Sequence, residues 1–237
     1  MRKLRELLTH WIYKEFNNES DRNAWVKFQL SKLPPGGKIL DAGAGTQQYR
    51  KWCDHLDYVS QDFDAFSVDK KSSMAAFITP YAYGSTDIVS DILSIPMPER
   101  SFDYILCTEV LEHVPKPVET IRELSRILKP GGILILTFPM NCLRHFDPYF
   151  FTSGLSDNWV NSILPEFGLT VKTLSPVGDY FSWMKVEIFR TIFSHRLNPL
   201  VWILLLPSLV FFSTKKKTEV SISTLCMGYH VIAQKSS

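Results

Sequence analysis

The stretch ILDAGAGTQQYRKW, residues 39–52, joins an apolar run, a Gly-x-Gly turn and a pattern typical of a helix. The apolar run ends at Asp41, and Gly43 and Gly45 let the backbone approach a ligand without a clash from Cβ. A strand, a glycine turn and a helix in this order usually cradle a nucleotide-like ligand. Gln47 stands where a third glycine is common, so the stretch raises the question of which ligand it holds.

The composition is that of an ordinary globular protein, with 237 residues, of which 45% are hydrophobic and 21% charged. A net charge of +2 argues against nucleic acid as a partner. Four cysteines lie far apart without a C-x-x-C motif, so we expect reduced thiols, three of them buried, and neither zinc nor a disulfide framework. Charges scattered through the first fifteen residues do not fit a signal peptide, and we expect a cytoplasmic protein.

Short apolar runs alternate with helical patterns along most of the chain, which predicts an α/β fold with a doubly wound, seven-stranded, mostly parallel sheet. The clearest helix covers 117–128, with proline in its first turn and KPGG at its end. Two further helices are expected at the N-terminus, around residues 4–12 and over 21–33. The expected strands are 38–40, 58–61, 87–90, 102–107, 132–138, 169–174 and 228–234.

These elements divide the chain into four parts. N-terminal helices cover 1–36, and an α/β core that binds the ligand covers 37–175. An apolar helical insertion covers 176–227, and the last strand and tail of the core cover 228–237. The insertion stands where a hairpin would need only a few residues.

Acidic residues end the first three expected strands. Asp62 follows Gly43 by nineteen residues, where a carboxylate accepts hydrogen bonds from two ribose hydroxyls. Asp91 suits an adenine amino group beside the apolar Ile92. With Asp41 these acids suit a ligand that has a ribose, an amine and a positive charge, and they would repel a pyrophosphate. A dinucleotide or nucleotide-sugar enzyme, which needs phosphate-binding glycines, is therefore the weaker alternative.

At this point the sequence resembles the class I S-adenosylmethionine-dependent methyltransferases of the type 11 group. The resemblance covers roughly 38–175 and rests on five blocks in the family's order and spacing. These blocks are ILDAGAGT, YVSQD, VSDILSIP, SFDYILCTEVLEHVPKP and LSRILKPGGILILTFP.

The resemblance implies S-adenosylmethionine as the cofactor, with no metal. Residues Asp41, Gly43, Ala44 and Gly45 would surround the methionine part of the cofactor, and Asp62 would hold the ribose. Phe63 would flank the adenine, Asp91 and Ile92 would recognise its edge, and Thr108 would face the sulfonium. Gln47 departs from the pattern. We expect it in the first helical turn, where glutamine is favoured over glycine by ~1 kcal/mol, so the missing glycine should not prevent the turn from binding its ligand.

A hydroxyl acceptor needs a general base, most often histidine, and two histidines follow expected strands. His113 lies in VLEHVP and either hydrogen-bonds backbone or takes part in catalysis. His145 lies among the aromatic residues of NCLRHFDPYFF and either packs there or acts as the base, with Asp147 as a possible partner. Glu109 and Glu112 are expected as helix-start or surface carboxylates.

The insertion contains a helix over 179–195 and then a charge-free run over 197–214. Its strongly apolar part, 199–212, is short for a bilayer span. Two readings stay open. One is a buried helix in a lid or dimer interface. The other is peripheral membrane contact through 179–217, at the inner face of the membrane, with Trp183 and Trp202 at the interface, Arg196 before the run and Lys215, Lys216 and Lys217 after it.

The sequence therefore predicts an S-adenosylmethionine-dependent methyltransferase that acts on a small-molecule, glycan or lipid-linked acceptor, as a monomer or homodimer. The alternative is a catalytically inactive scaffold that binds the cofactor on the same fold.

Overall fold

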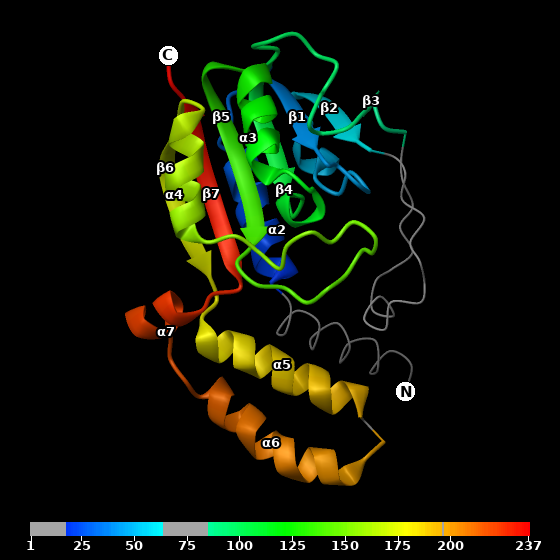
Figure 1. Ribbon diagram of the computed structural model, residues 1–237, viewed down its shortest axis with the longest axis vertical. Coiled ribbons are helices and arrows are strands. Elements are labelled where there is room, and N and C mark those ends of the chain that lie inside the picture. The colour runs from blue at the N-terminus through cyan, green and yellow to red at the C-terminus, as the bar shows by residue number, and fades with distance from the viewer. Residues whose placement is uncertain (1–17, 64–84, 196) are drawn as a thin grey trace. The chain divides into compact units, whose positions relative to one another are not determined.

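A computed structural model describes residues 18–63, 85–195 and 197–237. It contains a seven-stranded sheet in the order β3-β2-β1-β4-β5-β7-β6, shown in Figure 1. The strands are β1 (Lys38–Ala42), β2 (Asp57–Asp62), β3 (Ile88–Val89), β4 (Phe102–Thr108), β5 (Leu128–Pro139), β6 (Leu169–Val177) and β7 (Gly228–Lys235).

The first five strands run parallel, because β1 pairs in parallel with β2 and β4, β2 with β3, and β4 with β5. β7 is antiparallel. Near the end of β7, the Ser236 amide donates to the carbonyl of Gly168 at 2.8 Å, and the Gln234 Nε2 donates to that of Gly131 at 3.0 Å. The predicted seven-stranded, mostly parallel α/β sheet is thus confirmed.

Helices cover both faces of the sheet: in Figure 1, α3 (Pro117–Ile127) and α4 (Asp157–Glu166) lie in front of it and α2 (Glu19–Leu30) behind. Behind the sheet, Val26 and Leu30 of α2 share a buried cluster with Ile39, Leu106 and Ile135 from three strands. Burial of such apolar surface, at roughly 25 cal/mol per Å², is what fixes the register of the parallel strands.

The expected helix boundaries shift slightly. α2 spans Glu19–Leu30 instead of 21–33, since the amides of Lys32 and Leu33 bond back three residues and tighten the chain into a turn. α3 ends one residue early, because β5 begins at Leu128 and takes in the KPGG stretch. The helix expected around 4–12 lies outside the described residues.

α4 was missed by the sequence analysis, although it carries an ordinary signal. Ser156 caps it, with its side chain accepting a hydrogen bond from the Trp159 amide at 3.2 Å, and Val160 and Leu164 are buried four residues apart.

The chain divides into two compact units, and residues Trp25–Ser175 with Tyr229–Ser237 form the one that carries most of the sheet. The other includes residues 18–24 and Pro176–Gly228. It contains α5 (Tyr180–Ser194), α6 (Pro199–Ser213) and the short α7 (Glu219–Thr224). α5 and α6 form an antiparallel pair, with the Phe181 ring at the start of α5 6.3 Å from the Phe212 ring at the end of α6.

Asp179 joins the ends of two helices in this second unit. Its Oδ1 accepts the Ser182 amide at the start of α5, and its Oδ2 accepts the Ser221 hydroxyl of α7 at 2.7 Å. The helix predicted over 179–195 is confirmed. Among the described residues, none of the helices has both the length and the apolar character that crossing a membrane requires.

Candidate functional site

Asp41 lies at the carboxyl end of β1 and is almost fully buried, with 1% of its surface exposed. The hydroxyl of Tyr58, on the neighbouring β2, donates to its Oδ2 at 2.6 Å. Burial raises the pKa of Asp41 to about 7, because desolvation disfavours the charged form, whereas the Tyr58 hydrogen bond lowers it and the Asp62 charge raises it further. A positively charged group placed here would favour the carboxylate.

The turn after β1 needs glycine for reasons visible in its packing. Gly43 has a φ of +73°, and a Cβ built on it would lie 2.4 Å from a methyl group of Val110. The Gly45 amide donates to Asp62 Oδ2 at 2.7 Å. The turn is therefore held directly to the end of β2, at the edge where parallel α/β sheets bind ligands.

Gln61 ties together three segments of this edge and was not singled out by the sequence analysis. Its carbonyl accepts the amides of Gly43 and Ala44, both at 2.9 Å, and its side-chain Nε2 donates to the Ser90 carbonyl at 2.7 Å. Gln61 is 1% exposed. A glutamine that ends a buried strand is a weak signal by itself, but its burial needs polar partners, and these three provide them.

The prediction for Gln47 was wrong. Gln47 has a φ of +55° and lies in a turn, and the one-turn helix η1 (Arg50–Trp52) begins only after it. The left-handed region favours glycine, so glutamine is tolerated at a cost. Two hydrogen bonds offset this cost: Gln47 Nε2 donates to the Ser85 carbonyl, and Oε1 accepts from Arg50, each at 2.9 Å.

The carboxylate of Asp62, which the sequence predicts as the partner of the ribose, is held in place by two backbone amides. Its Oδ1 accepts the Phe63 amide at 2.7 Å, and its Oδ2 accepts that of Gly45, so its orientation is fixed. The Phe63 ring is 51% exposed and can lie against an adenine.

The part of the proposed site that would hold the adenine is more exposed to solvent. Asp91 is exposed, and its Oδ1 accepts the Leu93 amide at 2.9 Å, whereas Ile92 is buried. Thr108 ends β4, where the strand register places it opposite Thr137. The roles of these residues toward the cofactor stay predictions. The carboxylates of Asp41, Asp62 and Asp91 suit a ligand with a ribose, an amine and a positive charge.

The segment after β5 brings the two histidines together. His113 Nδ1 donates to the Tyr149 carbonyl at 2.7 Å, and its ring lies edge-on to that of His145, with centroids 4.7 Å apart. The Tyr149 ring in turn meets the Phe63 ring edge-on at 6.0 Å. These contacts link the proposed adenine-binding residue to the histidine pair.

The two histidines differ in their surroundings. Burial lowers the pKa of His113 to about 4, so its imidazole is neutral at pH 7. His145 is half-buried between the rings of Phe146 and Phe150, with centroids at 5.1 and 5.5 Å. Its Nδ1 bonds the Leu143 carbonyl at 2.7 Å, and because a carbonyl only accepts, the proton of the neutral ring sits on Nδ1 and the lone pair on Nε2.

Two carboxylates lie near the histidines. Glu112 stands in the first turn of the short helix η3 (Leu111–His113), as one of its two expected positions required, but it is 2% exposed and therefore not a surface residue. The backbone at Glu112 lies against the 142–151 segment, because the Phe151 amide donates to the Glu112 carbonyl at 3.0 Å. Asp147 pairs with Arg144, whose Nε reaches both carboxylate oxygens at 2.9 Å, and not with His145.

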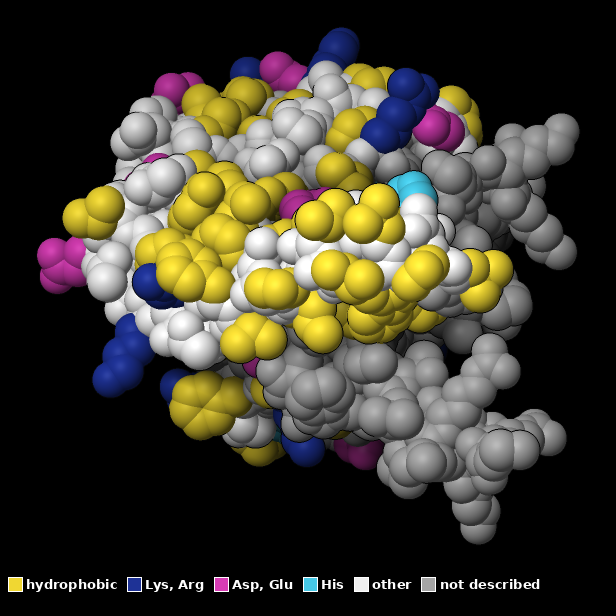
Figure 2. All heavy atoms as spheres, turned by 90° about the horizontal axis from the view of Figure 1, so that it is seen from below, with side chains coloured by type: hydrophobic (Ala, Val, Ile, Leu, Met, Phe, Trp, Pro, Cys, Tyr) yellow, Lys and Arg dark blue, Asp and Glu magenta, His cyan; other side chains and the backbone are white. Residues whose placement is uncertain are grey.

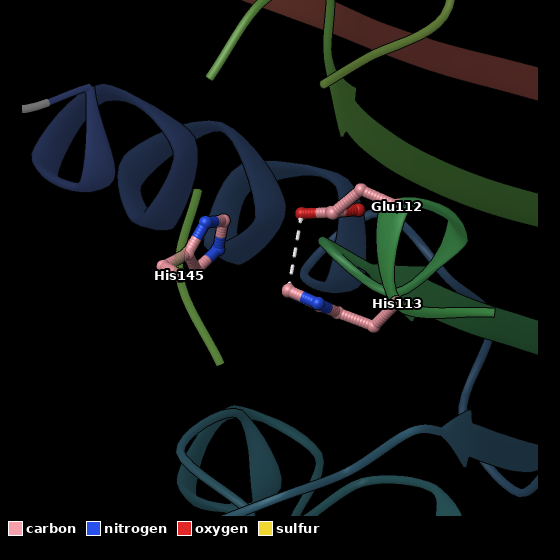
Figure 3. Close-up of side chains that lie close together, drawn as sticks. All are labelled: Glu112, His113 and His145. Atoms are coloured by element: carbon pink, nitrogen blue, oxygen red, sulfur yellow. Dashed lines mark ion pairs between the residues drawn. The ribbon is translucent and has the colours of Figure 1, made fainter. Parts of the chain in front are cut away.

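Glu112, His113 and His145 form the cluster that comes nearest to a metal site among the described residues (Figure 3). Their candidate ligand atoms lie within 4.8 Å of one another, and Glu112 Oε1 is 3.7 Å from His113 Nε2. Ligand atoms bound to one zinc ion at about 2.0 Å stand only about 3.3 Å apart, so the cluster would have to close. We assign no metal to it.

Comparison with known proteins finds related methyltransferases. A family model described as a methyltransferase domain matches residues 40–136. The demethylmenaquinone methyltransferase of Bacillus licheniformis is 22% identical over 195 residues, which cover 76% of this chain and 80% of that protein. The 2-methyl-6-phytyl-1,4-hydroquinone methyltransferase of Synechocystis is 29% identical over 113 residues, covering 45% of this chain and 33% of that protein.

A solved structure shares the fold. The phosphoethanolamine N-methyltransferase 2 of Haemonchus contortus, in complex with S-adenosyl-L-methionine, aligns with a TM-score of 0.51 and 15% identity. The alignment covers 91% of this chain and 52% of that chain.

Proposed function

This chain belongs to the class I S-adenosylmethionine-dependent methyltransferases, and we propose that it transfers the methyl group to a hydroxyl oxygen of an apolar acceptor. The observation that carries this proposal is His145, whose Nε2 lone pair stands within a cluster of aromatic rings. An imidazole in this tautomer can take a proton from a hydroxyl, and the rings suit an apolar or aromatic acceptor.

The cofactor, when bound, supplies a methyl group on positively charged sulfur, which needs no further activation. The residues of this chain position the acceptor, exclude water and remove its proton. We assign proton removal to His145 and the positioning of the acceptor segment to His113, which holds the Tyr149 carbonyl. The low pKa of His113 supports this division, because a group neutral at pH 7 does not repel the proton that His145 accepts.

The acceptor class is supported by the relatives, two of which are named for quinone or hydroquinone methylation. A hydroquinone offers a hydroxyl on an apolar ring. Deprotonating that hydroxyl also raises electron density at the neighbouring ring carbons, so the same base serves methylation at oxygen or carbon. We propose oxygen as the site and extend the acceptor class to small, glycan-linked and lipid-linked hydroxyls. Four free thiols support a cytoplasmic location.

The experiment is a methyl-transfer assay with labelled S-adenosylmethionine and short-chain hydroquinones. His145→Ala should lower kcat by roughly 10²-fold or more and leave the Kd for S-adenosylhomocysteine unchanged. Added imidazole should restore part of the rate, which a merely structural residue would not allow. His195→Ala is the matched control, because His195 also bonds a backbone carbonyl through Nδ1 but lies in the helical unit.

Three outcomes would contradict the proposal. A protein that binds S-adenosylhomocysteine but methylates none of the acceptors would be the inactive scaffold. A product with a new carbon–methyl bond, read by NMR, would move the reaction to carbon. Activity lost in EDTA and restored by Zn²⁺ would turn the Glu112, His113 and His145 cluster into a metal centre.

A further inference from the structure

The helix α6 is apolar on every side, with the sequence PLVWILLLPSLVFFS. Helices of this kind are normally buried in a protein core or in a membrane, because water would otherwise contact their apolar surface. Yet α6 has no buried residue. The surface of α6 is therefore available for contact with a partner outside the chain.

Only one side of α6 is taken up by its neighbour in the chain. The half-buried residues recur at helical spacing and match the side that packs on α5: Val201, Leu205, Ser208, Leu209 and Phe212. The remaining large side chains are exposed, with Ile203 at 69% and Leu204 at 62%. They are Leu200, Trp202, Ile203, Leu204, Leu206, Val210 and Phe211, which we call the α6 outer surface.

Figure 2 shows a crowded group of hydrophobic side chains on the face that it presents. Single exposed apolar residues are ordinary, but a contiguous group of this size marks an interaction surface. The group cannot be a transmembrane segment, because the 15 residues of α6 span about 22 Å. The hydrocarbon core of a bilayer is about 30 Å thick.

The charges around α6 distinguish between the two remaining partners for this surface, a lipid surface and a second copy of the chain. No acidic residue occurs in the sequence between Glu187 and Glu219. Three exposed lysines, Lys215, Lys216 and Lys217, follow α6 directly, and Lys215 Nζ lies 4.0 Å from the centroid of the Phe211 ring. The basic group thus borders the α6 outer surface.

We propose that the α6 outer surface and Lys215–Lys217 dock this protein reversibly on an anionic lipid surface. The exposed aliphatic and aromatic side chains enter the boundary between headgroups and acyl chains, Trp202 lies at that boundary, and the lysines contact anionic headgroups. This inference does not rest on the identity of the methyl acceptor. It does bring an acceptor dissolved in the membrane within reach of the protein.

A second copy of the chain fits the same surface less well. A two-fold contact that aligned two α6 helices in parallel would bring two sets of three lysines near one another, and like charges repel. An antiparallel contact would place each set beside the start of the other α6, where the sequence from 188 to 218 offers no acidic partner. Lysine is also depleted at protein–protein interfaces, whereas clusters of lysine are common on surfaces that contact anionic membranes. The charge pattern therefore favours lipid over protein.

Flotation of the whole chain with vesicles tests the proposal. One set is pure phosphatidylcholine, and the other contains phosphatidylglycerol as three parts in ten. We expect binding to the anionic vesicles that falls several-fold between low and high salt without vanishing, because salt screens the lysines but not apolar burial. Replacing Lys215, Lys216 and Lys217 with glutamine should lower the anionic partition coefficient by roughly 100-fold.

A second variant tests the apolar component. Ile203→Asp combined with Leu204→Asp should abolish binding to both vesicle types at every salt concentration. Both side chains are exposed, so the fold should survive, and unchanged circular dichroism and S-adenosylhomocysteine binding would confirm it. Phe28→Asp is the matched control, because Phe28 is 56% exposed on α2 and should leave vesicle binding as in the wild type.

The proposal fails if the wild-type chain stays out of the anionic vesicles at low salt, or if the Ile203→Asp, Leu204→Asp variant floats like the wild type. A dimer in sedimentation velocity that the same variant splits, without vesicle binding, would assign the surface to a second copy. Loss of methyl transfer with intact vesicle binding would concern the proposed reaction alone, so the two failures are distinguishable.

Discussion

The proposed cofactor edge of the sheet and the histidine pair each hold a titratable side chain whose pKa is shifted by burial, but the two pKa values move in opposite directions. At the proposed cofactor edge, burial raises the pKa of Asp41 to about 7. At the histidine pair, burial lowers the pKa of His113 to about 4. The physical cause is the same, because desolvation disfavours the charged form of either group.

The two regions differ in whether the buried group already has a partner that offsets its burial. Asp41 is destabilised as a carboxylate until a positive group comes near, which suits a ligand with an ammonium and a sulfonium. His113 already has its partner in the Tyr149 carbonyl, 2.7 Å away. The first region is prepared for a charged ligand, and the second is held together by its own contacts.

The largest effect is expected at Asp41. A raised pKa in the folded state means that the stability contributed by the protonated group is present below the ordinary pKa near 3.8 and is lost as the pH rises through about 7. About three pKa units correspond to at most about 4 kcal/mol. Asp41→Asn keeps an acceptor for the Tyr58 hydroxyl and removes the charge, so it should unfold at higher urea than the wild type at pH 8.

Urea titrations at pH 5, 6, 7 and 8 check this, and the gain should shrink toward pH 5. Tyr58→Phe serves as the control for the hydrogen bond. The Asn variant should also bind S-adenosylhomocysteine more weakly, since it lacks the negative charge. If the Asp41→Asn variant were less stable than the wild type at pH 8, the ionised Asp41 carboxylate would not destabilise the folded protein, and the prediction would be wrong.

Asp62→Ala should weaken S-adenosylhomocysteine binding by about 30-fold, through the loss of hydrogen bonds to the ribose and of the contact that holds Gly45. Titration calorimetry without added metal measures the Kd. Asp91→Ala, at the exposed and less built adenine edge, should cost less. Equal Kd values for Asp62→Ala and the wild type would remove Asp62 from the cofactor site.

His113→Ala should lower the free energy of unfolding at pH 7 by about 1–3 kcal/mol, because a buried hydrogen bond and the packing against His145 are lost. A pKa lowered by folding gives stability that is present above about 6.5 and is lost as the pH falls toward 4. The deficit of the variant should therefore shrink in acid.

His113→Asn is the sharper companion, since its side-chain amide can donate to the Tyr149 carbonyl from nearly the position of Nδ1 and should recover part of the loss. If His113→Ala instead kept full stability and lost turnover while His145→Ala did the reverse, the two roles would be exchanged.

Much of the fold followed from the sequence because local patterns determine it. The apolar strands, the proline at the start of α3 and the glycine turn at Gly43 each act over a few residues, and all were confirmed. α4 was missed although Ser156 and its buried Val160 and Leu164 carry a helix signal. The strand expected from residue 132 begins earlier, at Leu128, because the KPGG stretch that was taken as the end of the helix belongs to β5.

The candidate site was predictable only where a residue acts near its own strand end. Gln61 was missed because its three partners come from two other segments. The burial of Glu112 depends on a loop some thirty residues later in the chain. The pairing of Asp147 with Arg144 was missed, because the sequence analysis offered only His145 as a partner. Contacts between distant segments are set by packing, which a motif does not encode.

Substitutions of Gln47 should have the smallest effect on stability. They also distinguish the predicted helical Gln47 from the left-handed Gln47 of the structure. In a helix interior, Gln47→Gly would be about 1 kcal/mol less stable than Gln47→Ala. At a φ of +55° the order reverses: both variants lose the hydrogen bonds to Ser85 and Arg50, but only alanine keeps the left-handed strain, so glycine should be more stable by about 1 kcal/mol. Urea unfolding of the two variants side by side measures the difference, and S-adenosylhomocysteine affinity should change by less than about threefold in either, since the side chain points to Ser85 and not to the turn amides. An alanine variant more stable than the glycine variant would return Gln47 to a helix.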